Sequence, residues 1–269
     1  MADATILSLR SLTYFWPAKI SGMIIFRQIH TIYATIVFII TFLLVFPIFA
    51  LLAQNKRWHK TAYLITHYWG RIFLVLTGIK LRIENRNKEA WREPCVFVAN
   101  HFSYADIASV PMLTKGACFV GKQSIQKVPL FGYFFTSLHI SLNRESARDR
   151  AQVLQRGMAA LSEGKSLIIF PEGGIRSKNP PQQVDYKDGA FRMAINKGVP
   201  IVPITLPTNY KLMPDDGRLL LRGNKLNIVV HEAIDCRGMN ESNLKELKAR
   251  VFKTIQDELN RWNNSSNED

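Results

Sequence analysis

Two long apolar segments near the amino terminus give way, after about Lys80, to short apolar runs that alternate with amphipathic ones. The first segment has no Asp, Glu, Lys or Arg over the 25 residues from Ile29 to Ala53, which is long enough to cross a bilayer with some tilt. The second, from Thr61 to Ile79, is apolar and aromatic but contains Arg71. The pattern predicts two membrane-associated helices within residues 1–80, at about Ser21 to Ala53 and Trp58 to Thr77.

These two helices fit two topologies. In one, they dip into a single leaflet as a hairpin and return to the side they came from. In the other, the first helix spans the bilayer and places the amino terminus opposite the rest of the chain. Positive charge flanks the apolar segment Ile29 to Ala53 at both ends, with Arg27 before it and Lys56, Arg57 and Lys60 after it, so the positive-inside rule gives no orientation. Arg71 also makes full burial of the second helix in hydrocarbon costly. This ambiguity favours the hairpin, with the single span as the alternative.

Residues 81–269 show the alternation of short apolar and amphipathic segments that is typical of an α/β domain with a mostly parallel sheet flanked by helices. A helix is expected from Ala147 to Glu163, because Ser146 is a good N-cap and Gly164 follows the last periodic residue. Further helices are expected at Asp188 to Lys197 and Ser242 to Trp262. Strands are expected at Pro94 to Ala99, Ala117 to Val120, Leu138 to Leu142, Ser166 to Phe170, Pro200 to Leu206 and Leu226 to Val230.

A polar turn with a histidine and an aspartate follows the first expected strand. In the run NHFSYAD, from Asn100 to Asp106, His101 could serve as a base, because an imidazole titrates near neutral pH. Asp106 could bind the other ring nitrogen, fix the tautomer and stabilise the imidazolium. Taken alone, the run NHFSYAD could also be an ordinary capped turn without a catalytic role. The run FPEGGIRS, Phe170 to Ser177, repeats the pattern of an apolar strand that ends in a polar turn. Because ligands bind at the carboxyl ends of strands in open α/β sheets, the two turns predict one shared cleft.

The formal net charge of +14 is strong, and half of it lies in the amino-terminal part. Residues 1–80 hold eight Lys and Arg against one acidic residue, Asp3. Basic residues beside apolar segments suit an anionic membrane surface, where each contributes roughly 1 kcal/mol of attraction. Nucleic acid is not the expected partner, because no zinc-finger spacing, RNA-recognition signature or basic heptad helix accompanies the charge. The three cysteines, Cys95, Cys118 and Cys236, form no C-x-x-C and fit buried reduced thiols on the cytoplasmic side.

Four segments stand out together between about Asn100 and Pro207. They are NHFSYAD, GKQSIQKVPLFGYFF closing with SLNR (Gly121 to Arg144), FPEGGIRS, and VPIVPITLP (Val199 to Pro207). In this order they resemble the 1-acyl-sn-glycerol-3-phosphate acyltransferase family, within the glycerolipid acyltransferases that carry a His-x4-Asp motif. The chain departs from the family pattern at Arg176, which two residues separate from Gly173 where the family usually has one.

The resemblance implies a role for each candidate residue. His101 is the general base for the hydroxyl of a lysophospholipid, and Asp106 holds its ring. Glu172 bonds a glycerol hydroxyl or positions an arginine, with a buried structural ion pair as the alternative. Backbone amides around Gly173 and Gly174, or those near His101, stabilise the oxyanion. Lys122, Arg144 and Arg176 are expected to bind the phosphate of the acceptor. The alternative for each of them is an ordinary solvated surface residue.

The resemblance further implies direct transfer of a fatty acyl group from acyl carrier protein (acyl-ACP) or acyl-CoA to lysophosphatidic acid, giving phosphatidic acid. Since the sequence has no G-x-S-x-G segment, no acyl-enzyme is expected, and neither a cofactor nor a metal ion is expected. The expected setting is a bacterial inner membrane, with membrane lipids as partners and the catalytic domain facing the cytoplasm. The alternatives are an acyltransferase for another lysophospholipid or an amino-acid lipid, and a non-catalytic membrane-bound scaffold.

Overall fold

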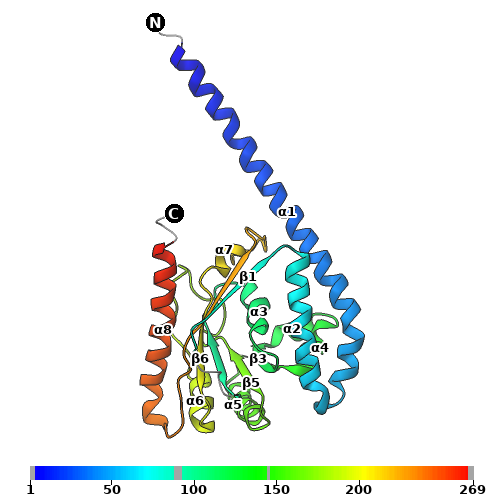
Figure 1. Cartoon of the computed structure of the whole chain (residues 1–269), viewed down its shortest axis with the longest axis vertical. Helices are drawn as coiled ribbons and strands as arrows, with labels where there is room; N and C mark the ends of the chain where they lie inside the picture. The colour runs from blue at the N-terminus through cyan, green and yellow to red at the C-terminus, as the bar shows by residue number, and fades with distance from the viewer. Residues whose placement is uncertain (1–3, 88–92, 144–145, 266–269) are drawn as a thin grey trace.

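The structure of the chain, a computed structural model, describes residues 4–87, 93–143 and 146–265, with side chains from residue 22 onward. A helix of 50 residues, α1 (Ala4–Ala53), comes first, and its amino-terminal half projects away from the rest of the molecule (Figure 1). After a short 3-10 helix, η1 (Lys56–Trp58), α2 (His59–Leu76) returns beside the carboxyl-terminal half of α1. Both expected helices are present, and α1 begins earlier than the pattern indicated.

The two amino-terminal helices differ in character. Within the described residues, one helical segment, Gly22–Ala53 of α1, is long and apolar enough to cross a membrane. α2 instead buries His59, Tyr63 and His67, and the Tyr63 hydroxyl donates to the carbonyl of Leu138 in the domain. The apolar helix indicates that the chain is membrane-associated. The two-helix anchor is not confirmed and stays a prediction.

Seven strands form one sheet in the described part of the chain, in the order β1-β7-β6-β2-β5-β3-β4. Of these neighbours, β6 and β7 pair antiparallel and the others pair parallel. The mostly parallel α/β sheet that the sequence predicted is therefore confirmed. The strands are β1 (Lys80–Asn85), β2 (Val96–Ala99), β3 (Ala117–Lys122), β4 (Ile140–Leu142), β5 (Ser166–Ile169), β6 (Ile201–Thr205) and β7 (Lys225–Val230).

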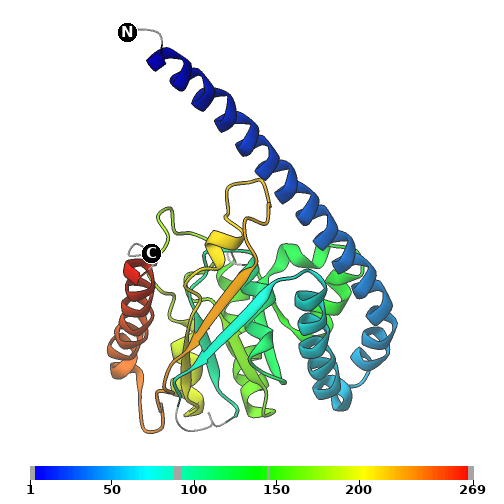
Figure 2. The ribbon, with the colours of Figure 1, turned by 45° about the horizontal axis from the view of Figure 1, so that its top comes forward.

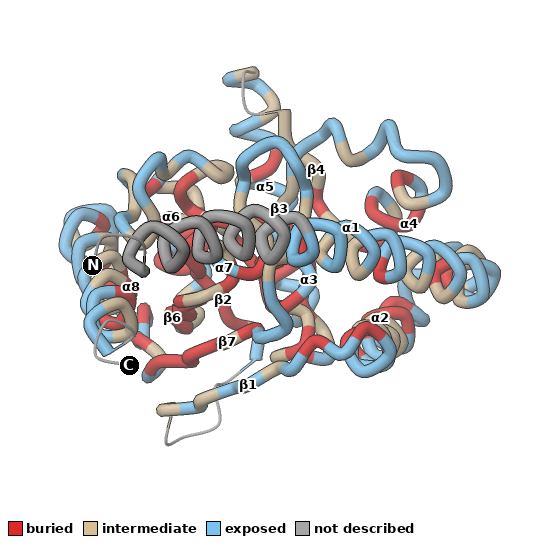
Figure 3. Tube along the Cα trace, turned by 90° about the horizontal axis from the view of Figure 1, so that it is seen from above, coloured by how far each residue is buried: buried red, intermediate tan, exposed pale blue. Residues whose placement is uncertain are grey.

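Helices cover both faces of this sheet, as Figures 1 and 3 show. Because side chains alternate along a strand, Val96 and Val98 of β2 pack on one face with α5 (Ala147–Ser162), α6 (Gly189–Lys197) and α8 (Leu244–Ser265). Phe97 points to the other face. That face carries α3 (Ala105–Ser109), η2 (Val110–Met112), η3 (Gln123–Lys127) and α4 (Phe131–Leu138), with α1 and α2 outside them. Two short elements, α7 (Asn209–Leu212) and η4 (Glu241–Asn243), lie in the remaining connections.

The elements that the sequence pattern missed are short or lie at an edge. β1 was not expected, because its sequence KLRIEN alternates apolar and polar residues and lacks the continuous apolar run of the buried strands. It is an edge strand that pairs with β7 alone. Leu138, which was expected to begin a strand, ends α4 instead. The expectation was wrong there because the end of α4 and the start of β4 are both apolar, so the sequence pattern does not show where the helix ends and the strand begins.

The strand register brings the two polar turns together. Val98 of β2 pairs with Ile169 of β5, so His101 and Glu172, each three residues further on, emerge at the same edge of the sheet. β3 is parallel to β5 as well, and Lys122 at its end reaches this edge. In Figure 2 the connection between α7 and β7 rises from this region towards α1.

Candidate active site

A histidine and a carboxylate meet in the turn after β2. Nδ1 of His101 lies 3.0 Å from Oδ2 of Asp106. Asp106 is fully buried, and 6% of His101 is exposed. With its proton on Nδ1, the ring donates to the carboxylate and keeps Nε2 as an acceptor for a substrate proton.

Asp106 is held by the backbone of its own turn. Its Oδ2 also accepts the N–H groups of Phe102 at 2.8 Å and Ser103 at 2.9 Å. α3 begins at Ala105, so Asp106 lies in its first turn and its side chain reaches back to the N–H groups that precede the helix. Oδ1 is buried without a hydrogen-bond partner among the described residues. Three donors on Oδ2 therefore fix the carboxylate, and through it the orientation of the imidazole.

Two residues without an expected role support this turn. The side chain of Asn100 bonds both backbone groups of Leu206: Nδ2 donates to the carbonyl at 3.2 Å, and Oδ1 accepts the N–H at 2.8 Å. The ring of Phe170 stacks on that of His101, with centroids 4.2 Å apart and an interplanar angle of 18°. Asn100 thus ties the end of β2 to the segment after β6, and Phe170 covers one face of the imidazole. The only sign of either role in the sequence is that each residue opens one of the two motifs.

Glu172 joins the second turn to the first. Its Oε1 accepts the backbone N–H of His101 at 2.8 Å, and its Oε2 accepts that of Val184 at 3.4 Å. The side chain is fully buried, and this burial raises the pKa of its carboxyl to about 7. In the described part of the chain Glu172 has no cation partner, so the buried ion pair considered for it is not found there.

The expected phosphate-binding cations are less tightly placed. Lys122 and Arg176 are exposed, and the side chain of neither makes a hydrogen bond or ion pair with another described residue. Arg144 lies outside the described residues. Gly173, with φ of 79°, and Gly174, with φ of 144°, give the second turn a backbone that side chains disfavour. The structure therefore brings the dyad of His101 and Asp106 next to the buried Glu172, whereas Lys122 and Arg176 lie at the surface.

An apolar cavity of about 570 Å³ lies between α1, α2 and the sheet. α3, which carries Asp106, contributes Ala105, Ile107 and Ala108 to its wall, and Tyr104 just before the helix lines it as well. Phe119 of β3 also lines it and stacks with Phe170, the ring that covers the imidazole, at 6.3 Å. Because the wall combines segments from the amino-terminal helices to β7, the linear sequence could not indicate this cavity.

Other reactive side chains are poor candidates for the chemistry of this site. Cys95, Cys118 and Cys236 are free and buried, and burial raises the pKa of the Cys118 and Cys236 thiols to about 11. A thiol reacts as a thiolate, which such burial disfavours. Across the residues that the structure describes, no group of three or more His, Cys, Asp and Glu side chains could hold a metal ion. His101 is left as the group best placed to move a proton.

Comparison with known proteins relates this geometry to acyltransferases. The Acyltransferase family model matches residues 80–207, which contain both turns. A chloroplastic 1-acyl-sn-glycerol-3-phosphate acyltransferase of Arabidopsis thaliana is 33% identical over 200 residues, which cover 72% of this chain and 55% of that protein. A protein of the same name from Chlamydomonas reinhardtii is 38% identical over 143 residues, or 53% and 42% of the two chains. The chain spans about half the length of these relatives.

A bacterial relative and a solved structure match over more of their length. The 1-acyl-sn-glycerol-3-phosphate acyltransferase of Haemophilus influenzae is 26% identical over 196 residues, which cover 69% of this chain and 76% of that protein. The crystal structure of the 1-acyl-sn-glycerophosphate acyltransferase of Thermotoga maritima covers 90% of this chain and 98% of that chain, with a TM-score of 0.75 and 19% identity. This likeness shows that the two chains share the fold.

Proposed function

We propose that this chain, which belongs to the 1-acyl-sn-glycerol-3-phosphate acyltransferase family, transfers a fatty acyl group from acyl-ACP or acyl-CoA to the free hydroxyl of lysophosphatidic acid. The product is phosphatidic acid. The observation that carries the proposal is the buried pair of His101 and Asp106 at the carboxyl edge of the sheet, close to an apolar cavity. A hydroxyl nucleophile needs a base, and a fatty chain needs an apolar pocket.

His101 acts as the general base in a direct attack. Its Nε2 takes the proton of the acceptor hydroxyl while the oxygen attacks the thioester carbonyl, and Asp106 stabilises the imidazolium through Nδ1. The tetrahedral oxyanion then collapses, so that the C–S bond breaks and the new C–O ester bond remains. The proton passes from Nε2 to the departing sulfur. One ester and one free thiol result, with no acyl-enzyme between them.

We assign the apolar cavity to a fatty acyl chain. Its volume of about 570 Å³ falls in the range of about 300–1,000 Å³ that is usual for ligand sites. Each methylene buried there contributes about 0.8 kcal/mol. α3 supplies Ala108 to the cavity and Asp106 to the pair of His101 and Asp106. One short helix therefore lies between the fatty acyl chain and the base, and it sets the distance between them.

The acceptor phosphate is assigned to Lys122, Arg144 and Arg176. The exposure of Lys122 and Arg176 leaves both side chains available to a ligand, and an arginine offers a bidentate fork to phosphate oxygens. Glu172 takes a positioning role in this scheme, because both of its oxygens accept backbone N–H groups, one of them from His101. The backbone amides around Gly173 are the nearby donors for the oxyanion.

We further propose that α1 and α2 hold the domain on the cytoplasmic face of the membrane without crossing it. The carboxyl-terminal half of α1 packs on the domain: Phe49 is 1% exposed, and its ring lies 4.6 Å from that of Phe134. This packing on the domain favours a helix that stays on one side of the membrane over one that crosses the bilayer. The part ahead of it is interrupted by Arg10, Lys19 and Arg27, and an arginine or lysine at the centre of a bilayer costs about 3 kcal/mol.

The topology is tested with a tag at the amino terminus in sealed inverted vesicles, whose outer face is the cytoplasmic one. External protease removes the tag if the helices return to their own side. Protection of the tag, with cleavage after detergent is added, would show a span and refute the hairpin.

The reaction is tested with purified protein, acyl-CoA, acyl-ACP and a panel of lysophospholipid and amino-acid lipid acceptors. Lysophosphatidic acid is expected to be the best acceptor, and His101→Ala is expected to lower kcat by about 10³-fold or more. The matched control is His30→Ala, because His30 lies on α1 and bonds the carbonyl of Thr77, away from the dyad. Retention of transfer by His101→Ala would point to another base, and wild-type protein that binds membranes but transfers nothing would point to a scaffold.

A further inference from the structure

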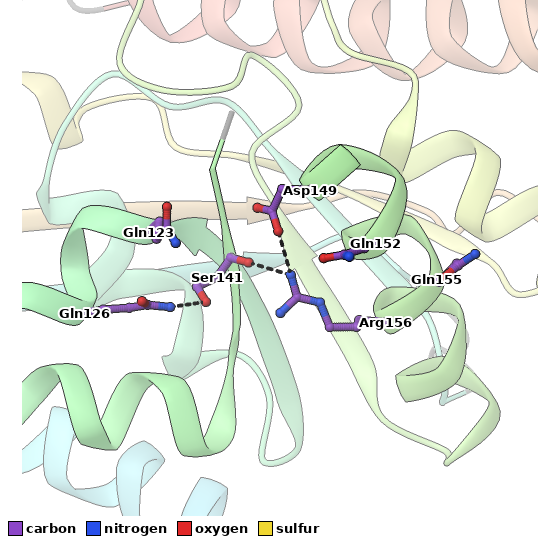
Figure 4. A pocket seen from close by; sticks show the side chains of 7 residues that line it. All are labelled: Gln123, Gln126, Ser141, Asp149, Gln152, Gln155 and Arg156. Atoms are coloured by element: carbon purple, nitrogen blue, oxygen red, sulfur yellow. Dashed lines mark hydrogen bonds and ion pairs between the residues drawn. The ribbon is translucent and has the colours of Figure 1, made fainter. Parts of the chain in front are cut away.

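A second pocket, of about 380 Å³, opens between η3, β4 and α5 (Figure 4). Gln123 and Gln126 come from η3, Ser141 from β4, and Gln152 and Arg156 from α5. Figure 4 shows the two η3 glutamines on one side of Ser141 and the α5 side chains on the other. The proposed reaction gives none of these residues a role.

The pocket is rich in amides and close to neutral. Nη2 of Arg156 donates to the carbonyl of Ser141 at 3.1 Å and to Oδ1 of Asp149 at 3.4 Å, so a carboxylate balances its one cation. Nε2 of Gln126 donates to the Ser141 hydroxyl at 2.5 Å. Glutamine amides, a hydroxyl and a backbone carbonyl offer both donors and acceptors to a neutral polar ligand. A phosphate would need more positive charge than this wall supplies.

The strand register places this pocket at a defined distance from the dyad. Ser141 pairs with Gly121 of β3, and the pairings of β3 with β5 and of β5 with β2 put Ala99 in the same row. Three strand spacings therefore separate Ser141 from Ala99, or about 14 Å. His101 follows Ala99 by two residues at the same edge of the sheet.

We infer that this pocket binds the pantetheine arm of the thioester donor, an inference that rests on the proposed acyl transfer. CoA and acyl carrier protein share this arm, which carries two amides and a hydroxyl and has no charge between its sulfur and its phosphate. The arm has the backbone length of about four residues, so its extended reach is about 14 Å. With the thioester at His101, the far end of the extended arm reaches the position of Ser141. Its second amide and its hydroxyl, which lie just short of that end, come to the side of the pocket that Gln126 and Gln152 help to line.

The test is the double variant Gln126→Leu with Gln152→Leu. Both glutamines are exposed, and leucine keeps their bulk without their hydrogen bonds. Losing two neutral hydrogen bonds is expected to raise KM about tenfold for acyl-CoA and acyl-ACP alike, with KM for lysophosphatidic acid within about twofold. The control is Ala159→Leu, an exposed position of α5 outside the pocket, which is expected to change neither KM.

The possible outcomes separate this inference from the function on which it rests. Wild-type protein that transfers nothing from either donor overturns both. If the wild type is active, an unchanged KM for both donors overturns the pantetheine site alone. An increase confined to acyl-CoA indicates contact with the nucleotide, one confined to acyl-ACP indicates a protein contact, and one confined to the acceptor indicates its site. Each of these three results also overturns the inference.

Discussion

The turns after β2 and β5 both follow a buried strand, but they are held in different ways. In the first turn the side chains that matter are buried and bonded: Asn100 and Asp106 are fully buried, and His101 is 6% exposed. In the second turn Glu172 is buried in the same way, but Arg176, four residues later, is exposed. One turn is closed by its own hydrogen bonds, and the other opens to the surface after its first residues.

The difference follows from what each turn is proposed to do. Proton transfer requires the base and its partner within hydrogen-bond distance before the substrate arrives, and Oδ2 of Asp106 achieves this with three donors. A phosphate brings its own charge and can draw a flexible guanidinium to itself. Changes in the first turn should therefore affect kcat, and changes at the surface of the second should affect the KM of the acceptor.

The largest effect should come from removing the charge of the first turn with Asp106→Asn. Two backbone N–H donors require an acceptor at the Oδ2 position, so the asparagine keeps its oxygen there and the ring keeps its orientation. What is lost is the attraction between imidazolium and carboxylate, about 4 kcal/mol at an effective dielectric constant of 20. We expect kcat to fall about 10³-fold, in steady-state assays with saturating donor.

The control for that variant is Asp257→Asn, which removes an exposed carboxylate on α8. It should leave kcat unchanged. If kcat falls less than tenfold in Asp106→Asn, the charge of the carboxylate is not needed for proton transfer and the side chain only shapes the turn. The proposed difference between a catalytic first turn and a substrate-binding second turn would then be wrong.

The next effect concerns Glu172, the residue that links the turns. Burial raises the pKa of its carboxyl from the ordinary 4.5 to about 7, so between these values the folded chain holds a proton that the unfolded chain has released. Stability therefore falls as pH rises through this window, by up to about 3 kcal/mol. Glu172→Gln cannot titrate and should lose this slope when the free energy of unfolding is measured from pH 5 to pH 8.

A matched variant for this experiment is Glu241→Gln, whose carboxylate is 60% exposed in a surface ion pair. It should keep the slope of the wild type. If the wild-type slope also survives in Glu172→Gln, the buried carboxyl is not its source.

A smaller effect is expected at the open side of the second turn. Arg176→Ala should raise the KM for lysophosphatidic acid about tenfold, the equivalent of one charge-assisted contact, and leave the melting temperature unchanged because the side chain is exposed without a described partner. Lys178→Ala, two residues further along and also exposed, tests whether any nearby cation would do. Equal effects of both variants would reduce Arg176 to part of a diffuse positive surface.

How far the sequence could predict these turns depends on the range of the contacts. The strands β2 and β5 were predictable because each is a continuous apolar run, and His101 and Asp106 lie in one turn, so their pairing is a local matter. The bond from His101 to Glu172 joins residues 71 positions apart. It depends on the register of β2 with β5, which no local pattern contains.

The cavity and the stacked ring were beyond prediction for the same reason. Thr31 of α1 and Leu226 of β7 line one cavity, and Phe170 covers His101 from another strand end. β1 escaped notice because an edge strand with alternating charges looks like exposed coil. The sequence supports the chemistry within a turn, whereas the pockets that hold ligands depend on how distant segments pack.

The smallest effect should arise from the backbone of the second turn itself. Gly173 has φ of 79°, and an added Cβ would meet only the Lys187 side chain, at 3.9 Å. Gly173→Ala therefore costs about 1 kcal/mol of unfolding free energy through its dihedral angle rather than through a clash. Gly116→Ala is the control, because its Cβ would enter open space at an ordinary φ, and it should be neutral in the same denaturant titration. If Gly173→Ala is also neutral but lowers kcat, the turn is adaptable in the free protein and its amides matter in the transition state, which would make the second turn a partner of the first in the chemistry.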